Sequence, residues 1–252
     1  MTRVIRDHEE LRAWRRGAGE TGFVPTMGAL HAGHEALLRR ARAENEAVVL
    51  SVFVNPAQFN DPKDLENYPA TWESDLSLAE KSGVDVLWAP TKEILYPDGY
   101  RYRVSEGDFS RGLCGAHRPG HFDGVLTVVM KLLQVSSPTR AYFGEKDYQQ
   151  LMLIRGMAAA FFLPVEIISV PTVREADGLA LSSRNVRLTA GEREKAPLIH
   201  RVMREARTAE DARARLVGAG FQVDYVEDHD GRRYVAATLG STRLIDNGEI
   251  AP

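Results

Sequence analysis

The strongest structural signal in this 252-residue chain is the stretch Pro25-Thr26-Met27-Gly28-Ala29-Leu30-His31-Ala32-Gly33-His34. The residues before it, Gly22-Phe23-Val24, have the apolar character of the end of a buried strand, and residues 34–42 have the pattern of a helix. A glycine-containing turn from strand to helix presents free backbone N–H groups and the positive end of a helix dipole, which together attract phosphate. The stretch therefore predicts a phosphate-binding turn.

Two histidines and two glycines define the expected chemistry of this turn. His31 and His34 are three residues apart, so their imidazoles share one face of the first helical turn. Gly28 and Gly33 lack a Cβ, which would let a ligand approach the backbone closely. Histidine pairs of this spacing are often surface or packing residues, and zinc ligation is a further possibility. The flanking residues include no cysteine and few carboxylates, so we favour a nucleotide triphosphate site with two imidazole donors.

The composition predicts a soluble, cytoplasmic globular protein. Hydrophobic residues make up 44% of the chain and charged residues 27%, and a net charge of −3 gives no general affinity for nucleic acid or for anionic membranes. A single cysteine, Cys114, excludes an internal disulfide and is typical of a small, partly buried hydrophobe. The N-terminus has no secretory pattern, and the apolar region 151–170 is interrupted by Arg155, Pro164 and Glu166.

Apolar runs of strand length alternate with helical patterns over the first two-thirds of the chain. We expect strands at residues 47–54, 84–88, 141–143 and 165–170, and helices at 71–82, 125–135 and 148–162. Thr71 and Asp123 are the expected N-caps of the first two helices. This alternation predicts an α/β fold with a parallel sheet covered by helices on both faces, and with ligands bound at the carboxyl ends of the strands.

The pattern changes near Pro171-Thr172. Helices are expected at about 190–206 and 209–217, followed by strands at 222–226, 233–238 and 242–245. Helices followed by consecutive strands are typical of a small α+β domain. We therefore expect two domains, residues 1–171 and 172–252.

Polar side chains follow the strand predicted at 47–54. Asn55 and Gln58 lie just beyond its end, where an α/β sheet binds its ligands. Amide side chains both donate and accept hydrogen bonds, which suits a hydroxy-acid substrate. Gln58 is the stronger candidate, because Asn55 precedes a proline and Asn-Pro is a frequent turn. Further along, Arg118 and His121 lie on a glycine-rich loop and either contact a carboxylate or phosphate or belong to a solvated loop.

A second strand-to-helix turn follows residues 141–143. There, Gly144 permits close approach, Lys146 supplies a positive charge, and Asp147 either accepts from ribose hydroxyls or caps the helix. Gln150 falls on the same helix face as Asp147.

A hydroxyl- and arginine-containing loop follows the expected domain boundary. It contains Ser182, Ser183 and Arg184, which together could hold a phosphate group, with the arginine binding an oxygen pair.

Taken together, these segments resemble the pantothenate synthetase (pantoate–β-alanine ligase) family. The resemblance covers nearly the whole chain, in the segments 25–34, 53–59, 118–124, 143–150, 171–185 and 242–247. Residues 31–34 resemble the HIGH signature of the nucleotidyltransferase superfamily of class I aminoacyl-tRNA synthetases, and residues 181–184 resemble its KMSKS signature. The resemblance implies a Rossmann-like domain with a smaller C-terminal domain, assembled as a homodimer. The region 189–220 looks shorter than is usual in the family.

The resemblance also implies a reaction and a set of site residues. Pantoate would be adenylated by ATP, with Mg²⁺ bridging the phosphates, and β-alanine would then displace AMP. His34 would be the proton donor, Gln58 and Gln150 would hold pantoate, and Gln58 would also lie near β-alanine. The residues expected to bind ATP are Met27, Gly28, Ala29, Leu30, His31, Ala32, Gly33, His34, Gly144, Glu145, Lys146, Asp147, Val173, Leu181, Ser182, Ser183 and Arg184.

Within this set, His31, His34, Lys146 and Arg184 are the expected catalytic residues, because they can stabilise the charge that grows on the phosphate oxygens. Asn55, Arg118 and His121 join the two glutamines as expected substrate contacts. Asp75 and Gln150 are candidate metal ligands.

Two other functions share part of this pattern. An adenylyltransferase acting on a phosphate-bearing acceptor would use the histidine turn but would leave Gln58 and Gln150 without a purpose. A nucleotide sensor without turnover would need affinity, but not side chains specialised for a transition state.

Overall fold

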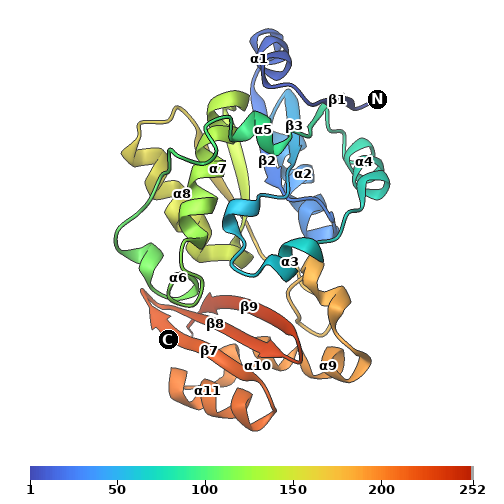
Figure 1. The fold of residues 1–252 in the computed structure, drawn as a ribbon. Helices are drawn as coiled ribbons and strands as arrows, with labels where there is room; N and C mark the ends of the chain where they lie inside the picture. Colours follow the sequence, from blue (N-terminus) through green and yellow to red (C-terminus); the bar gives the residue numbers. More distant parts are fainter. Residues whose placement is uncertain (251–252) are drawn as a thin grey trace.

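A six-stranded parallel sheet forms the centre of the N-terminal part of the chain (Figure 1). The structure is a computed structural model, and it describes residues 1–250. The strands are β1 (Arg3–Ile5), β2 (Thr21–Thr26), β3 (Ala47–Val52), β4 (Val86–Trp88), β5 (Arg140–Gly144) and β6 (Glu166–Val170). Their order is β1-β4-β3-β2-β5-β6, and all neighbours pair in parallel. The predicted Rossmann-like sheet is confirmed.

Helices cover both faces of this sheet (Figure 1). They are α1 (His8–Gly17), α2 (Ala32–Glu44), α3 (Pro62–Glu66), α4 (Trp72–Lys81), α5 (Lys92–Leu95), α6 (Cys114–His117), α7 (His121–Ser136) and α8 (Tyr148–Ala160), with short 3₁₀ turns η1 (Pro56–Gln58), η2 (Phe109–Arg111) and η3 (Glu145–Asp147). Because successive strand residues point to opposite faces, Phe23 packs in one core with α1, α7 and α8, and Val24 packs in another with α2 and α4.

The strand order places the two predicted turns side by side. From β2 the chain builds the sheet toward β3 and β4, and it later returns to add β5 on the other side of β2. Ligands of open α/β sheets bind where the strand order reverses in this way, at the carboxyl ends of the strands. The turn after β2 leads into α2, and the turn after β5 leads into α8. The topology therefore brings His31 and Lys146 to the same crevice.

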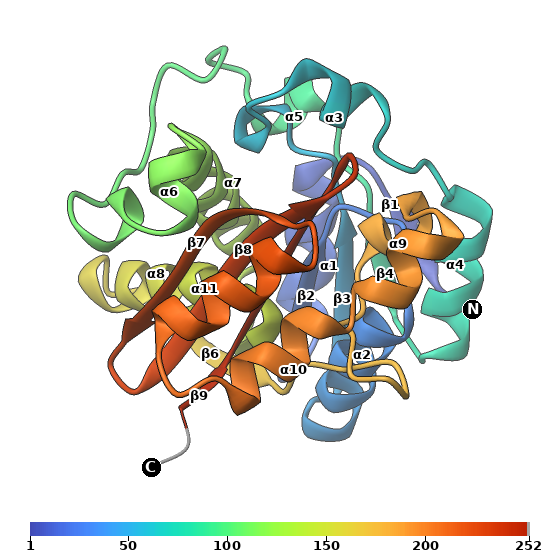
Figure 2. The same cartoon turned by 90° about the horizontal axis from the view of Figure 1, so that it is seen from below.

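The C-terminal part is a three-stranded antiparallel sheet with helices. Its elements are η4 (Ser183–Arg187), α9 (Ala190–Lys195), α10 (Leu198–Glu205), α11 (Ala209–Gly218), β7 (Gln222–His229), β8 (Arg232–Leu239) and β9 (Thr242–Glu249). From below, α10 and α11 lie over one face of this sheet, and the parallel sheet lies behind it (Figure 2). Successive residues of β8 point to opposite faces of this sheet. Val235 therefore packs with α10 and α11, whereas Tyr234 and Ala236 pack against the N-terminal part.

Two expectations about local structure were wrong, and a third was met in position only. Residues 190–206 do not form one helix, because Pro197 separates α9 from α10 and cannot donate a backbone hydrogen bond. Asp123 is not an N-cap, since α7 begins two residues earlier at His121 and is preceded by Gly120 in the left-handed conformation (φ 78°). Thr71 does occupy the N-cap position of α4, but its hydroxyl bonds to Asp75 and makes no capping hydrogen bond.

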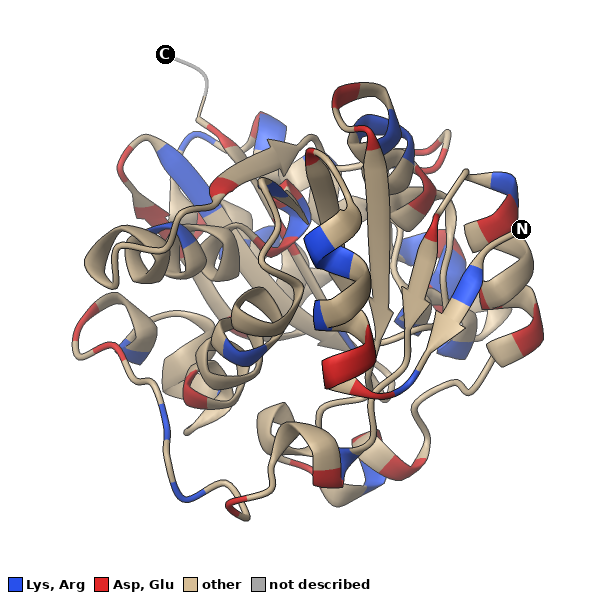
Figure 3. Ribbon diagram, turned by 90° about the horizontal axis from the view of Figure 1, so that it is seen from above, with Lys and Arg blue, Asp and Glu red and all other residues tan. Residues whose placement is uncertain are grey.

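Charges of both signs are interspersed over the elements seen in Figure 3. Within residues 1–250, no helix combines the length and the apolar character needed to cross a membrane.

Candidate active site

A cavity of about 250 Å³ lies at the carboxyl ends of β2 and β5. Most of the expected site residues line it: Met27, His31, Gly33, His34, Asn55, Gln58, Arg118, His121, Gly144, Lys146, Asp147, Gln150, Val173, Leu181, Ser182, Ser183 and Arg184. Gly28, Ala29, Leu30, Ala32 and Glu145 do not line the cavity, although they belong to the same two turns. The structure therefore gathers five separate sequence segments around one space.

The two histidines are locked into one tautomer by backbone amides. The N–H of His31 donates to Nδ1 of His34 (3.3 Å), and the N–H of Gly33 donates to Nδ1 of His31 (3.1 Å). Together these bonds cap the first turn of α2. Because each Nδ1 accepts a hydrogen bond, each neutral ring carries its proton on Nε2. The ring centroids are 4.1 Å apart and both rings line the cavity, so two Nε2–H donors lie next to each other there.

Both histidines are held in the neutral form. Burial lowers the pKa of His34 to about 3, and the neighbouring His31 and Lys146 contribute to this lowering. Burial and Lys146 also lower the pKa of His31. At neutral pH these rings therefore act as hydrogen-bond donors without a positive charge.

Asp75, on α4, holds the backbone of the histidine turn in place. Its carboxylate accepts from the backbone N–H groups of Ala29 (3.0 Å) and Leu30 (2.8 Å), and from the Thr71 hydroxyl (3.1 Å). Asp75 is only 2% exposed, so these bonds satisfy a buried charge. This role was not predicted from the sequence, since nothing in the local pattern links Asp75 to a turn 45 residues away.

The two glycines of the turn are needed for internal packing, because a side chain at either position would collide with the protein's own atoms, and Gly33 also lines the cavity. A Cβ on Gly28 would lie 2.9 Å from Asp75 Oδ2, and Gly28 also has a φ of +82°. A Cβ on Gly33 would lie 2.8 Å from the His31 ring. In contrast, nothing lies within 4 Å of a Cβ built on Gly144, so this glycine does leave open space.

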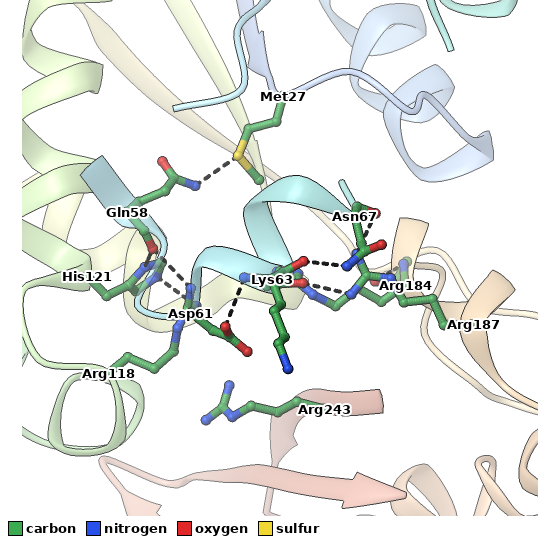
Figure 4. A network of polar contacts seen from close by, with 12 residues as sticks. Met27, Gln58, Asp61, Lys63, Asn67, Arg118, His121, Arg184, Arg187 and Arg243 are labelled. Atoms are coloured by element: carbon green, nitrogen blue, oxygen red, sulfur yellow. Dashed lines mark hydrogen bonds and ion pairs between the residues drawn. The ribbon is translucent and has the colours of Figure 1, made fainter. Parts of the chain in front are cut away.

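Asn55 holds the side chain of Gln58. Its Nδ2 donates to Gln58 Oε1 (3.0 Å) and to the Gly124 carbonyl (3.1 Å), while its Oδ1 accepts from the Tyr96 hydroxyl (2.8 Å) and from the Ala57 N–H (3.3 Å). Asn55 is 1% exposed, and its amide is fully used within the protein. Gln58 Nε2 in turn donates to the Met27 sulfur (3.0 Å; Figure 4).

Arg118 and His121 both bind the backbone carbonyl of Gln58, so they do not belong to a solvated loop. Arg118 Nη2 (3.1 Å) and His121 Nδ1 (2.9 Å) donate to this oxygen, as Figure 4 shows. His121 Nε2 therefore accepts from Arg118 Nη1 (3.2 Å). Burial and the adjacent Arg118 lower the pKa of His121 to about 3, and burial and the nearby Arg184 lower the pKa of Arg118 to about 10.

The turn after β5 is fixed by the C-terminal sheet. Asn247, on β9, donates from Nδ2 to the carbonyls of Glu145 and Lys146 (2.9 Å each). The Lys146 ammonium lies 3.5 Å from the Asp147 carboxylate. Asp147 occupies the N-cap position of α8 without a capping hydrogen bond, so that expected alternative was wrong.

The 182–184 loop also lines the cavity. Ser182 caps η4 by accepting from the Arg184 N–H (3.2 Å). The Arg184 guanidinium donates to Asp64, on α3 (2.8 Å), an unexpected partner 120 residues away.

Cys114, of the N-terminal part, is buried as expected, and its sulfur lies 3.1 Å from the Tyr225 hydroxyl.

Within residues 1–250, no group of three or more His, Cys, Asp or Glu side chains is arranged to hold a metal ion. The carboxylate of Asp75, a candidate ligand, is already engaged by two backbone N–H groups.

Comparison with known proteins identifies the family. The model of the pantoate-beta-alanine ligase family matches residues 3–249. The pantothenate synthetase of Bdellovibrio bacteriovorus is 61% identical over 251 residues, which are 99% of this chain and 100% of that protein. The pantothenate synthetase of Coxiella burnetii is 48% identical over 249 residues, 98% of this chain and 96% of that one.

Solved structures agree with this assignment. The pantothenate synthetase of Thermus thermophilus has a TM-score of 0.93 and 44% identity, with 100% of both chains covered. The pantoate-beta-alanine ligase of Francisella tularensis, solved with beta-gamma ATP and beta-alanine, has a TM-score of 0.94 and 39% identity, with 99% of this chain and 98% of that one covered. The chain therefore belongs to the pantoate–β-alanine ligase family and is a ligase that makes pantothenate.

Proposed function

We propose that this ligase works in two half-reactions within the cavity at the ends of β2 and β5. A pantoate carboxylate attacks the α-phosphate of ATP and releases pyrophosphate, and the β-alanine amine then attacks the pantoyl carbonyl carbon and releases AMP. The observation that carries this proposal is the convergence of His31, His34, Lys146 and Arg184 on one cavity from three separate segments. The Francisella relative, solved with an ATP compound and β-alanine, supports the same assignment of ligands.

The four convergent side chains would stabilise the transferred phosphate. Lys146 and Arg184 supply positive charge, and the Nε2–H groups of His31 and His34 supply neutral donors that are already oriented. Oriented donors aimed at developing charge usually provide the largest part of catalysis. With a pKa of about 3 in the structure, His34 would serve by donating a hydrogen bond, and proton transfer would require bound phosphate to raise that pKa.

Pantoate would bind between the two glutamines. Gln58 and Gln150 line the cavity beside the apolar side chains of Val125, Val128 and Leu132. Amides suit the two hydroxyl groups of pantoate, and the apolar wall suits its dimethyl carbon. Asn55 would act through Gln58, because its own amide has no free hydrogen-bonding position.

β-Alanine would enter beside Gln58. Arg118 lines the cavity near the Gln58 amide and is a suitable partner for a carboxylate. Holding the amine close to the activated carbonyl would supply much of the second step, since an alkyl amine is mostly protonated at neutral pH.

Mg²⁺ would arrive bound to the triphosphate and would neutralise part of its charge. Gln150 and Asp147 line the cavity with oxygen atoms that could complete its coordination.

Residues 172–252 would form the smaller domain that closes the cavity, by way of Ser182, Ser183 and Arg184. We also propose a homodimer in the cytoplasm. The apolar side chains exposed at the end of α8, Phe161 and Phe162 (56% and 92% exposed), would suit a subunit contact. The free Cys114 fits a reducing compartment.

Pantoate-dependent exchange of labelled pyrophosphate into ATP tests the first half-reaction. Exchange that requires pantoate, together with AMP release that requires β-alanine, supports the proposal. Exchange with a phosphate-bearing acceptor instead would favour an adenylyltransferase, and ATP binding without any exchange would favour a sensor.

A further inference from the structure

Asp64 joins α3 to the loop of the C-terminal part that lines the cavity. Its Oδ2 accepts from Arg184 Nη2 (2.8 Å) and its Oδ1 accepts from Arg187 Nη1 (2.7 Å). Asp64 lies on α3. The two arginines, which are labelled in Figure 4, lie on η4 of the C-terminal part. The three side chains are 25%, 27% and 26% exposed, so this bidentate clamp is largely shielded from solvent.

One further hydrogen bond ties the same segments together. Arg187 Nη2 donates to the backbone carbonyl of Asn67 (2.9 Å). Residues 64–67 are thus joined to residues 184–187 by three polar contacts. A link made of three polar contacts across two segments is better defined than a single surface ion pair.

The clamp lies between two cavities. Tyr68, Ser183 and Arg184 line the reaction cavity, whereas Asp64, Asn67 and Arg187 line a neighbouring cavity of about 860 Å³. Arg184 lines both, as do Arg118, Lys146, Asp147 and Ser182. The contacts between α3 and η4 therefore lie where the reaction cavity adjoins the larger space.

The clamp also orients the Arg184 guanidinium. Within residues 1–250, its one ion pair is with Asp64, through Nη2 alone. A guanidinium is planar and carries five N–H donors, so fixing one edge against a carboxylate determines where the other donors point. Although burial tends to raise the pKa of Asp64, the hydrogen bonds and charges of Arg184 and Arg187 lower it overall, so the carboxylate is ionised at neutral pH.

The proposed intermediate must be shielded from water. A pantoyl adenylate is a mixed anhydride, and water can attack its carbonyl carbon: a carbon–oxygen bond forms, the bond to the phosphate oxygen breaks, and pantoate, AMP and protons are released. Each such event consumes ATP without making pantothenate. Closing an active site against water prevents this side reaction.

We propose that Asp64 is a positioning residue that orients Arg184 and, together with Arg187, keeps water from the acyl adenylate. This inference rests on the proposed role of Arg184 and on the adenylate pathway. It assigns to α3 a function in coupling ATP consumption to product formation.

The test measures coupling and adenylation separately in the full-length chain. The variants are Asp64→Asn, which removes the charge with little change of shape, Asp64→Glu, which restores it, and Arg187→Gln, which breaks the clamp but leaves the Arg184–Asp64 pair in place. The readouts are AMP released per pantothenate formed, AMP released with pantoate but without β-alanine, and pantoate-dependent pyrophosphate exchange. Thermal melting of each variant verifies folding.

We expect Asp64→Asn to slow exchange about tenfold or more, since misplacing a catalytic group by about 1 Å can cost up to a hundredfold. It should also release at least two AMP per pantothenate, and Asp64→Glu should restore most of the coupling. Arg187→Gln should release excess AMP while its exchange rate stays within about threefold of wild type. One AMP per pantothenate in both Asp64→Asn and Arg187→Gln would overturn the proposal.

The same data separate this inference from the proposed function. If wild type shows no pantoate-dependent exchange, the adenylate pathway itself is wrong. If wild type exchanges and Arg184→Ala does not, while both clamp variants stay coupled, only the role of Asp64 is wrong.

Discussion

The carboxylate of Asp75 accepts the backbone N–H of Leu30 at 2.8 Å, so a buried charge on α4 fixes the turn that carries both histidines. This contact makes Asp75 a support for the turn. A metal-ligand role would require its carboxylate to bind the cation and the turn at the same time.

Asp75→Asn should therefore weaken the turn without removing any group from the cavity. The amide keeps one acceptor but places N–H donors against the backbone N–H groups of Ala29 or Leu30. We expect a loss of about 1.5–3 kcal/mol in the free energy of unfolding, as for buried hydrogen bonds to charged groups, measured by urea denaturation. Thr71→Val removes one bond to the same carboxylate and is the matched control, with a loss of about 1 kcal/mol. Equal losses in the two variants would contradict this account of Asp75.

His34 should act through its Nε2–H donor. His34→Ala is expected to slow pantoate-dependent pyrophosphate exchange about 10²–10³-fold, as loss of one transition-state donor typically does. His34→Gln places an amide donor near the position of Nε2, so its exchange rate should be at least tenfold higher than that of His34→Ala. A glutamine variant as slow as the alanine variant would indicate that the imidazole must become charged or transfer a proton.

The local parts of the fold and site were predictable, because their causes are local. Neighbouring residues determine the glycine-containing turn, the β-branched strands and the helices that follow them. The sequence pattern therefore predicted correctly that His31, Gln58 and Lys146 lie beyond the ends of strands. The three-residue strand β1 and the largely exposed α1 were missed, since Leu11 is the one buried residue of that helix.

The supporting contacts could not be predicted, because they join distant segments. Asp75 reaches back 45 residues to Leu30, and Asp64 meets Arg184 across 120 residues. A sequence pattern identifies these residues only as helix-surface carboxylates. The same reason explains Asn55, which was expected to contact substrate and is instead engaged with Gln58 and Tyr96.

The buried histidines should make stability depend on pH in one direction. The pKa values of His34 and His121 are lowered from 6.5 to about 3 in the folded state. Below pH 6.5 the unfolded chain therefore binds protons that the folded chain does not, and the free energy of unfolding falls as the pH falls, by up to about 1.4 kcal/mol per pH unit for each histidine. Above about pH 7.5 this contribution is constant.

Urea denaturation between pH 5 and pH 8 measures this dependence. His121→Gln should reduce the pH dependence of the free energy of unfolding below pH 6.5 by the contribution of one histidine. This reduction is expected whether or not the substitution changes stability at pH 8. An undiminished slope in His121→Gln would show that His121 titrates normally in the folded protein.

Asn55 should control how well Gln58 receives pantoate. Asn55→Asp places carboxylate oxygens against Gln58 Oε1 and the Gly124 carbonyl, where the native amide donates. The Gln58 amide should then rotate away from its position beside Met27, and we expect KM for pantoate to rise about tenfold. A tenfold rise corresponds to one lost hydrogen bond of about 1.4 kcal/mol. KM for ATP should change by less than threefold, because the hydrogen bonds of the Asn55 side chain go to Gln58, Gly124, Tyr96 and Ala57, none of which lies in the histidine or lysine turn. Tyr96→Phe is the matched control: it removes one bond to the same Asn55 side chain but leaves both amide donors in place, so KM for pantoate should stay within threefold of wild type. A tenfold rise in both KM values for Asn55→Asp would mean that Asn55 supports the cavity as a whole and does not act through Gln58.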